Sequence, residues 1–404
     1  MIFRPIEFQP SHIVYFERLS PCLPFVGTMG VEMRRSGLGI TLVAAALVAA
    51  ACTSGPVSPA APASGSASGT AAATTREMTE YLDGLVRLQQ FRGAVEVRLG
   101  DEVLLSKGFD QADVSQDVSN EPDTRFRIAS LTKQFTGLAV LILQEQGKLK
   151  VSDPVCTHLP NCPATWRAIT IEHLLTHTAG LYDYVKVSGG DPQRYATAFG
   201  PEPTPEQLMQ TFVKRPLEFP PGSKFAYSSS GYVLLGRLIE QLSGVTYGQF
   251  LKDQILDPLD MSDTAYQPDE QATAHDAVGY QDWTTPGANA PDAVSFAGGG
   301  MYSTVTDFTR WNHFLLTGTP AIVKEDTLAQ LLRPRVAVDH GAQYCYGIGT
   351  EGTGDGTTYS HSGGVPGFAT YNEIRPATAL SIVVLSNLET TDAIRIGHNL
   401  AMLA

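Results

Sequence analysis

Ser130 and Lys133 are the residues whose types and spacing could do chemistry together. Residues three apart on a helix lie on the same side of it, so these two side chains would meet on one. A serine hydroxyl is a poor nucleophile unless a base stands beside it, and a lysine buried among apolar groups loses affinity for its proton and can be that base. We therefore expect Ser130 to be a nucleophile. The alternative is an N-cap serine followed by a surface lysine.

The surrounding sequence predicts a helix that begins at this serine. Residues 114–128 are polar and extended in character, whereas 131–146 have helical periodicity. The apolar positions of that helix form one stripe: Leu131, Phe135, Leu138, Ile142 and Leu143. The N-terminus of the helix would bring partial positive charge and free backbone N–H groups close to the serine hydroxyl.

The rest of the domain has strands at its two ends and helices in its middle. Alternation around Gly100-Asp101 predicts a hairpin of 93–99 with 102–106. Further strands are expected at 341–350, 357–362, 369–375 and 380–386. Helices are expected at 79–90, 204–217, 233–242, 247–255 and 306–316, and from 391 onward. This order favours an α/β fold of the α+β type, an antiparallel sheet flanked by helices with a mostly helical inserted subdomain.

Composition sets broad limits on function. The 404 residues are 43% hydrophobic and 17% charged, which is typical of a globular protein with a substantial core. The formal net charge of −13, with no basic patch among aromatic residues, argues against a nucleic-acid partner.

Residues 1–51 are expected to be an export signal behind a mis-annotated upstream stretch. Met33-Arg34-Arg35 precedes an apolar run at 38–51 that is short for a membrane span and suits a secretory signal. Ala49-Ala50-Ala51-Cys52 resembles the lipobox of bacterial lipoproteins, so Cys52 is a lipidation candidate, with simple cleavage or a retained anchor as alternatives. Residues 52–75 read as a flexible Ala/Ser/Gly/Pro tether, and 76–404 as the working domain. The protein is thus expected outside the cytoplasm, secreted, periplasmic or lipid-anchored.

The remaining cysteines fit an oxidising compartment. Cys156 and Cys162 flank a short Pro-rich loop, and a disulfide between them is preferred because the loop offers too few ligands for a metal site. Cys345 lies in an apolar context and is expected to be a buried structural thiol.

Two other patterns could indicate a cofactor. His173 and His177 are four apart on a predicted helix, but no carboxylate stands between them as in zinc hydrolases, so packed histidines at a helix end are expected. Gly298-Gly299-Gly300 lacks the Lys-Ser/Thr of a phosphate-binding loop. We expect no metal and no organic cofactor.

Three short segments carry a family resemblance: Ser130-Leu131-Thr132-Lys133, Tyr227-Ser228-Ser229 and His361-Ser362-Gly363. In that order they resemble the three motifs of the serine β-lactamase and penicillin-binding-protein superfamily. The branch is that of class C β-lactamases, D-alanyl-D-alanine carboxypeptidases and related esterases. Connecting stretches such as 174–181 and 298–304 match as well, so the resemblance spans essentially 76–404. It implies a β-lactamase/transpeptidase-like fold.

The resemblance also implies roles. Ser130 would be the acylated nucleophile, Lys133 its proton partner, and Tyr227 the general base that later protonates the leaving group. His361 would bind a substrate carboxylate or tune Tyr227. Gly363 would let substrate approach, and the N–H groups of Ser130 and Gly364 would form the oxyanion hole. The remaining substrate-binding positions would be Ser229 and Ser362. Alternatives are a core aromatic for Tyr227 and a strand-edge histidine for His361.

Ser229 is a departure, because the second motif usually ends in asparagine. A serine is shorter and reaches less far than an amide, which weakens the expectation of penicillin-type substrates. The leading hypothesis is a serine hydrolase acting on D-amino-acid peptides, esters or β-lactams, with a peptidase or esterase favoured over an efficient lactamase. The alternative is a catalytically weak member that binds cell-wall peptide or a protein partner. The sequence does not indicate an oligomeric state.

Overall fold

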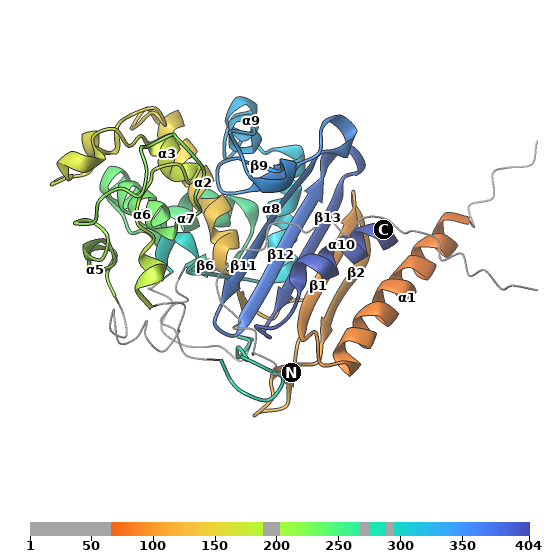
Figure 1. Ribbon diagram of the computed structural model, residues 1–404. Helices are drawn as coiled ribbons and strands as arrows, with labels where there is room; N and C mark the ends of the chain where they lie inside the picture. The colour runs from red at the N-terminus through yellow and green to blue at the C-terminus, as the bar shows by residue number, and fades with distance from the viewer. Residues whose placement is uncertain (1–65, 189–202, 267–274, 288–294) are drawn as a thin grey trace, which may run out of the picture.

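A large antiparallel sheet organises the molecule. The computed structural model describes residues 66–188, 203–266, 275–287 and 295–404. Eight strands run in the order β2-β1-β13-β12-β11-β10-β9-β8, and neighbours are antiparallel (Figure 1). Their bounds are β1 Gly93–Leu99, β2 Glu102–Phe109, β8 Val336–Ala337, β9 Gln343–Tyr344, β10 Gly349–Glu351, β11 Thr358–Val365, β12 Phe368–Arg375 and β13 Leu380–Ser386. Because β1 pairs with β13, the sheet is built from both ends of the domain, as the sequence predicted.

Helices cover both faces of the sheet. Helices α1 (Ser66–Arg87) and α10 (Ala393–Leu403) lie on one face, and α8 (Val305–Thr317) lies on the other (Figure 1). Beyond α8 the helical part holds α2 (Thr132–Glu145), α3 (Ile171–Leu175), α5 (Pro205–Gln210), α6 (Ser229–Ser243), α7 (Tyr247–Leu251) and α9 (Glu325–Leu332). The minor sheets pair β3 (Gln111–Asp113) with β4 (Val118–Ser119), and β7 (Met301–Ser303) with β5 (Phe126–Arg127) and β6 (Ala265–Tyr266).

Strand β13 shows how the sheet separates two cores. Ile382 and Val384 pack with α1 and α10, whereas Val383 and Leu385 join the core that contains α2. Successive side chains of a strand point to opposite faces, so a strand that is apolar throughout can serve both cores.

Helix α2 is buried all round: the expected apolar stripe is buried, and so are the polar residues on its other sides. Every residue from Thr132 to Leu143 is buried. The helix lies between the sheet layer and the other helices, so both of its sides meet protein. A helix in that place must satisfy its polar side chains internally.

Several element boundaries differ from the expected ones. Helix α1 begins at Ser66, so 66–75 are helical although a flexible tether was expected there; alanines at 71–73 are strong helix formers. The Thr75 hydroxyl donates to the carbonyl of Leu104 on β2 at 2.6 Å, which holds this helix near the sheet. Helix α5 ends at Gln210, earlier than the pattern predicted. The leader, with Cys52, lies outside the described residues.

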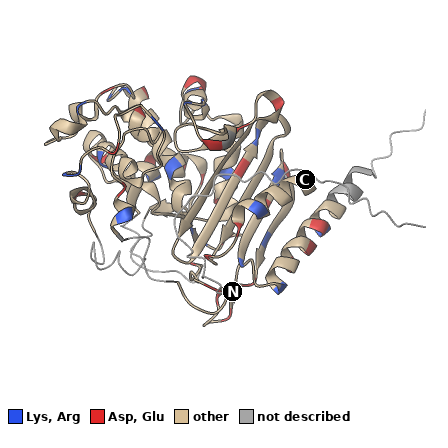
Figure 2. Ribbon diagram, viewed as in Figure 1, with Lys and Arg blue, Asp and Glu red and all other residues tan. Residues whose placement is uncertain are grey.

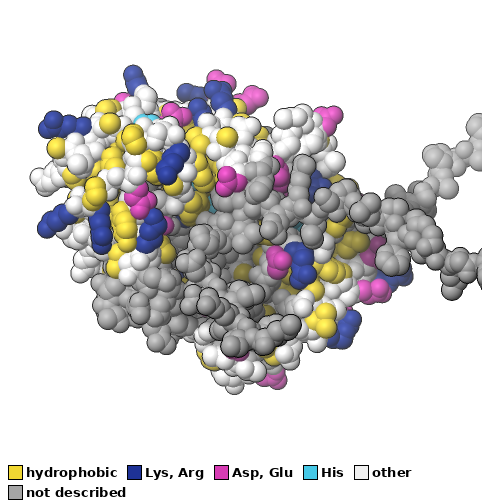
Figure 3. Space-filling view, in the orientation of Figure 1, with side chains coloured by type: hydrophobic (Ala, Val, Ile, Leu, Met, Phe, Trp, Pro, Cys, Tyr) yellow, Lys and Arg dark blue, Asp and Glu magenta, His cyan; other side chains and the backbone are white. Residues whose placement is uncertain are grey.

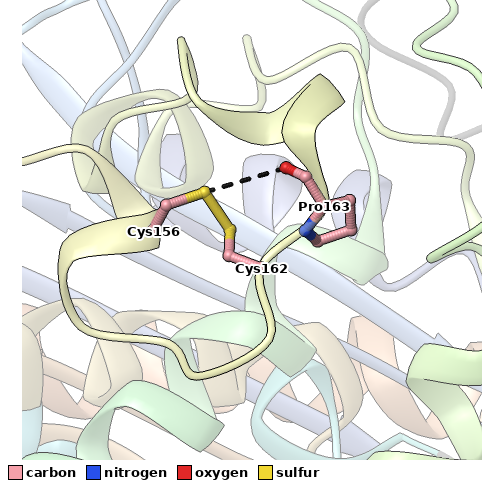
Figure 4. The surroundings of a disulfide bond; sticks show 3 residues. All are labelled: Cys156, Cys162 and Pro163. Carbon is pink, nitrogen blue, oxygen red and sulfur yellow. Dashed lines mark hydrogen bonds between the residues drawn. A yellow bond between two sulfur atoms is a disulfide. The ribbon is translucent and has the colours of Figure 1, made fainter.

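The cysteines behave as expected. Figure 4 shows the disulfide between Cys156 and Cys162, which closes the Pro-rich loop. Cys345 is a free, buried thiol whose pKa is raised to about 12 by burial.

The surface is mixed in character. Charged residues are spread over helices and loops, while the strands of the large sheet carry few (Figure 2). Figure 3 shows charges of both signs interspersed with apolar side chains on the visible face. Among the described helices, none combines the length and apolarity that a membrane crossing needs.

A buried amide network ties α2 to the sheet. Gln134 of α2 donates to Asn372 of β12 at 2.9 Å and accepts from the Trp311 indole N–H at 3.0 Å. Asn372 in turn donates to Asn312 at 2.9 Å, and Asn312 donates to Ser381 at 3.0 Å. A buried network in which each member is satisfied holds its elements in one arrangement.

Removing the central amide should be costly. Asn372→Leu would leave the Gln134 Nε2 donor and the Asn312 Oδ1 acceptor unpaired in a dry interior, while each of these side chains keeps its other partner. We therefore expect the free energy of unfolding to fall by about 2–4 kcal/mol. Urea denaturation measures it. Ile382→Leu, an apolar swap of equal volume in the same sheet, is the control and should cost under about 1.5 kcal/mol. If Asn372→Leu lowers the free energy of unfolding by no more than the control does, the network does not stabilise the fold to this extent.

Candidate active site

The serine lies on a tight turn between β5 and α2. Ser130 sits in the short 3-10 helix η1 (Ala129–Leu131), and Ala129 before it has φ of 49°. A non-glycine residue in this left-handed region costs of order 1 kcal/mol and persists only where its surroundings hold it. The Thr370 hydroxyl of β12 supplies part of that hold by donating to the carbonyl of Ile128 at 3.0 Å. The turn leaves Ser130 partly exposed.

Strand β11 approaches this turn closely at Gly363. A Cβ built on Gly363 would lie 2.6 Å from the Ile128 carbonyl oxygen and 3.0 Å from the Ala129 Cβ. Glycine is therefore required for the strand to pass beside the nucleophile turn. At the next position, Gly364 is exposed and a Cβ there would meet nothing within 4 Å.

Lys133 is buried beside the serine. Its Nζ lies 3.2 Å from Ser130 Oγ and donates to the carbonyl of Gly298 at 2.6 Å. The side chain is fully buried, and burial lowers the pKa of Lys133 to about 7, an effect that the charge of Asp183 partly offsets. A substantial fraction of the amine is therefore neutral near pH 7 and can accept the serine proton.

Tyr227 joins this pair. Lys133 Nζ lies 4.8 Å from the centroid of the Tyr227 ring. On another side the His177 ring packs against Tyr227 with centroids 4.1 Å apart. The Tyr227 hydroxyl is buried while the residue as a whole is partly exposed. The expected trio of hydroxyl, amine and phenol thus comes together from segments almost 100 residues apart.

His361 lies near the tyrosine and forms its hydrogen bonds with Tyr344 and Ser362. Its ring centroid is 6.4 Å from that of Tyr227, and His361 is buried. Its Nδ1 contacts the carbonyl of Ser362 at 2.6 Å, and its Nε2 contacts the hydroxyl of Tyr344 at 3.1 Å. Burial and the nearby charge of Lys133 lower the pKa of His361 to about 4. His361 is therefore neutral at pH 7.

Ser229 occupies the start of α6, next to a carboxylate. Its backbone N–H donates to Asp183 Oδ1 at 3.2 Å. Burial raises the pKa of Asp183, while that N–H and the charge of Lys133 oppose the rise. Ser229 and Ser362 are both partly exposed, which is compatible with substrate contact.

Four residues near the site were not assigned a role from the sequence: Asp183, His177, Tyr344 and Gly298. Gly298 acts through its carbonyl oxygen, which side-chain patterns do not report. The sequence predicts His173 and His177 as packed histidines at a helix end, and both are hydrogen-bonded. Helix α3 ends at Leu175 and His177 has φ of 56°, so His177 lies just beyond the helix. For His177 and Gly298, the resemblance of stretches 174–181 and 298–304 to the family was the sequence feature that could have indicated a place near the site.

Comparisons with known proteins agree with this geometry. The family model described as Beta-lactamase matches residues 76–404. The putative penicillin-binding protein PbpX of Bacillus subtilis is 28% identical over 302 residues, covering 74% of this chain and 71% of that protein. Protein flp of Staphylococcus aureus is 28% identical over 298 residues, covering 72% of this chain and 58% of flp, so the chain spans less than two thirds of that relative. The crystal structure of a penicillin-binding protein from Bacillus halodurans superposes with a TM-score of 0.72 at 25% identity, covering 80% of this chain and 99% of that one.

Adding a methyl group at Gly363 should displace the nucleophile turn. We expect Gly363→Ala to lower the free energy of unfolding by about 1–3 kcal/mol, because the new Cβ meets backbone on one side and the Thr370 hydroxyl on the other. Gly364→Ala is the matched control and should change stability by less than about 0.5 kcal/mol, since its Cβ points into open space. Thermal and urea unfolding measure both. Equal stability of the two variants would contradict the tight approach of β11.

Proposed function

The chain belongs to the Beta-lactamase family, and we propose that it is a serine hydrolase that forms an acyl-enzyme on Ser130. The observation that carries the proposal is the 3.2 Å contact between Ser130 Oγ and the buried amine of Lys133, beside the Tyr227 ring. Acyl transfer through a serine needs a base of lowered pKa beside the hydroxyl and a second group that carries the proton to the leaving group.

The proposed steps follow from these positions. Ser130 Oγ attacks the substrate carbonyl carbon while its proton passes to Lys133 or Tyr227. The oxyanion is stabilised by the backbone N–H groups of Ser130 and Gly364. As the bond to the leaving group breaks, the Tyr227 phenol protonates that group. Water then attacks the acyl carbon and passes a proton to Tyr227 or Lys133. The bond between that carbon and Ser130 Oγ breaks, Oγ takes the proton back, and the acid leaves.

We propose D-amino-acid peptides, esters or β-lactams as the acyl donors, with peptides and esters favoured over β-lactams. Ser229 is the reason for that order, because a hydroxyl cannot offer a substrate amide both a donor and an acceptor at the reach of asparagine. The binding of cell-wall peptide or of a protein partner without turnover is the second candidate, and Ser229 is also the feature that favours it.

We propose that the protein works outside the cytoplasm. The disulfide between Cys156 and Cys162 supports an oxidising compartment. An export signal in 1–51 and lipidation of Cys52 would take it there and tether it to a membrane. Globomycin treatment of producing cells, or mass measurement of the mature N-terminus, tests the lipid.

An adduct on Ser130 separates the two candidate functions. We expect a fluorophosphonate to add one covalent group to the folded protein, at Ser130, as seen by intact-mass and peptide mass spectrometry. A panel of p-nitrophenyl esters, D-alanyl peptides and a chromogenic cephalosporin should show turnover that Ser130→Ala reduces by at least ~10³-fold. Ser303→Ala, which changes a buried serine of β7 whose hydroxyl contacts Thr264 and none of the reacting groups, is the control. Folded protein with neither adduct nor turnover would favour the binding function.

The rate of that labelling should rise with pH. Since the pKa of Lys133 is about 7 and the neutral amine is the base, the labelling rate should climb about tenfold per pH unit below pH 7 and level off above it. In Lys133→Arg the guanidinium stays protonated throughout, so the labelling rate of this variant should be slow and should not change with pH over the same range. Stopped-time labelling between pH 5 and 9 measures both profiles. A wild-type rate that is constant from pH 5.5 to 8.5 would rule out Lys133 as the base.

A further inference from the structure

A line of four hydrogen bonds joins the second motif to the third behind Tyr227. The Ser228 backbone N–H lies 3.2 Å from His177 Nδ1, and His177 Nε2 lies 3.2 Å from the Tyr344 hydroxyl. The same hydroxyl lies 3.1 Å from His361 Nε2, and His361 Nδ1 lies 2.6 Å from the Ser362 carbonyl. His177, Tyr344 and His361 are all buried.

Counting protons gives this line a direction. A carbonyl oxygen only accepts, so His361 Nδ1 carries a hydrogen and donates it to Ser362. In a neutral imidazole the other nitrogen accepts, so the Tyr344 hydroxyl donates to His361 Nε2. The Tyr344 oxygen then accepts from His177 Nε2–H, which leaves His177 Nδ1 to accept from the Ser228 N–H. The two histidines hold opposite tautomers.

Neutrality of both histidines has a physical cause. His361 faces Lys133, Tyr227, Tyr344 and His177, none of them a carboxylate. Burial and the charge of Lys133 lower the pKa of His361 to about 4, and the same two causes lower the pKa of His177 well below its usual value.

We propose that Tyr344 and His177 are positioning residues that hold His361 neutral with both of its ring nitrogens engaged, so that the site prefers neutral esters and amides over acyl donors that carry a carboxylate. The proposal rests on the hydrolase function above. It differs from the role that the sequence suggested for His361, because a ring whose two nitrogens are bound within the protein offers no charge or donor to a substrate carboxylate. The net charge of −13 also disfavours an anionic substrate.

Nitrogen NMR of the whole protein, labelled with 15N-histidine, tests the tautomers directly. At pH 6.5 we expect His361 as the neutral Nδ1–H form and His177 as the neutral Nε2–H form, assigned with His361→Gln and His177→Gln. A protonated His361 at this pH, or the same tautomer at both residues, would overturn the proposal. This readout needs neither substrate nor turnover.

Tyr344→Phe removes the hydroxyl in the middle of the line. His177 Nε2–H then loses its acceptor, while His177 Nδ1 remains 3.2 Å from the Ser228 carbonyl, so His177 should change to the Nδ1–H tautomer. Tyr346→Phe is the matched control: it removes a nearby hydroxyl that donates to Glu172, and both tautomers should stay as in the wild type. An unchanged His177 in folded Tyr344→Phe would overturn the direction of the line. Should Tyr344→Phe fail to fold, the wild-type tautomers still decide.

A pair of substrates tests the specificity. An acylated D-alanyl-D-alanine with a free carboxylate and its methyl ester differ in charge beside the scissile peptide bond. Release of D-alanine or of D-alanine methyl ester, followed by mass spectrometry, reports cleavage of that bond alone. We expect kcat/KM to favour the methyl ester by about tenfold or more, equivalent to ~1.4 kcal/mol. A preference for the free carboxylate would overturn the specificity. Absence of any Ser130 adduct with a fluorophosphonate would instead overturn the hydrolase function itself, so the two failures are distinguishable.

Discussion

Burial of the Lys133 ammonium is the constraint on which the rest of the site depends. An amine can be neutral near pH 7 only if protein replaces its water, and α2 achieves this by being enclosed on all sides. Desolvation alone would leave the donor hydrogens unsatisfied. The Gly298 carbonyl at 2.6 Å and Ser130 Oγ at 3.2 Å supply partners that keep the amine aimed at the hydroxyl.

Enclosing α2 dictates much of the architecture. The helix contacts α6, α9 and the sheet strand β12, so strands from both chain ends and a helical insertion must assemble around it. The buried amides of Gln134 and Asn372 fix the rotation of α2 against β12. That rotation, together with the close approach of β11 at Gly363, decides where the nucleophile turn lies. In this fold, the contacts that stabilise the core around α2 therefore also set the position of the nucleophile turn.

The sequence predicted features whose signals are local. The hairpin at Gly100, the strand pair around 376–378 and the disulfide loop all depend on near neighbours, and the structure has each of them. The order of the three motifs indicated which distant side chains would meet. The full enclosure of α2, the Gly298 carbonyl and the His177–Tyr344 contact were not predicted, because each joins segments far apart in sequence and two of them use no recognisable side-chain pattern. The helical residues 66–75 were missed because composition alone does not report docking against β2.

The departure at Ser229 and the neutral third motif fit one electrostatic picture. The chain places Asp183 against the Ser229 N–H at the start of α6, close enough to Lys133 for each to shift the pKa of the other. Lys133 and Asp183 are then the sources of positive and negative charge in the site, and the neutral His361 contributes no charge. Under the proposed specificity, a substrate carboxylate near Ser229 would add to the negative charge of Asp183, and the third motif would supply no cation to balance it. A neutral acyl donor leaves this internal balance undisturbed, and for it the shorter Ser229 removes only reach, not charge.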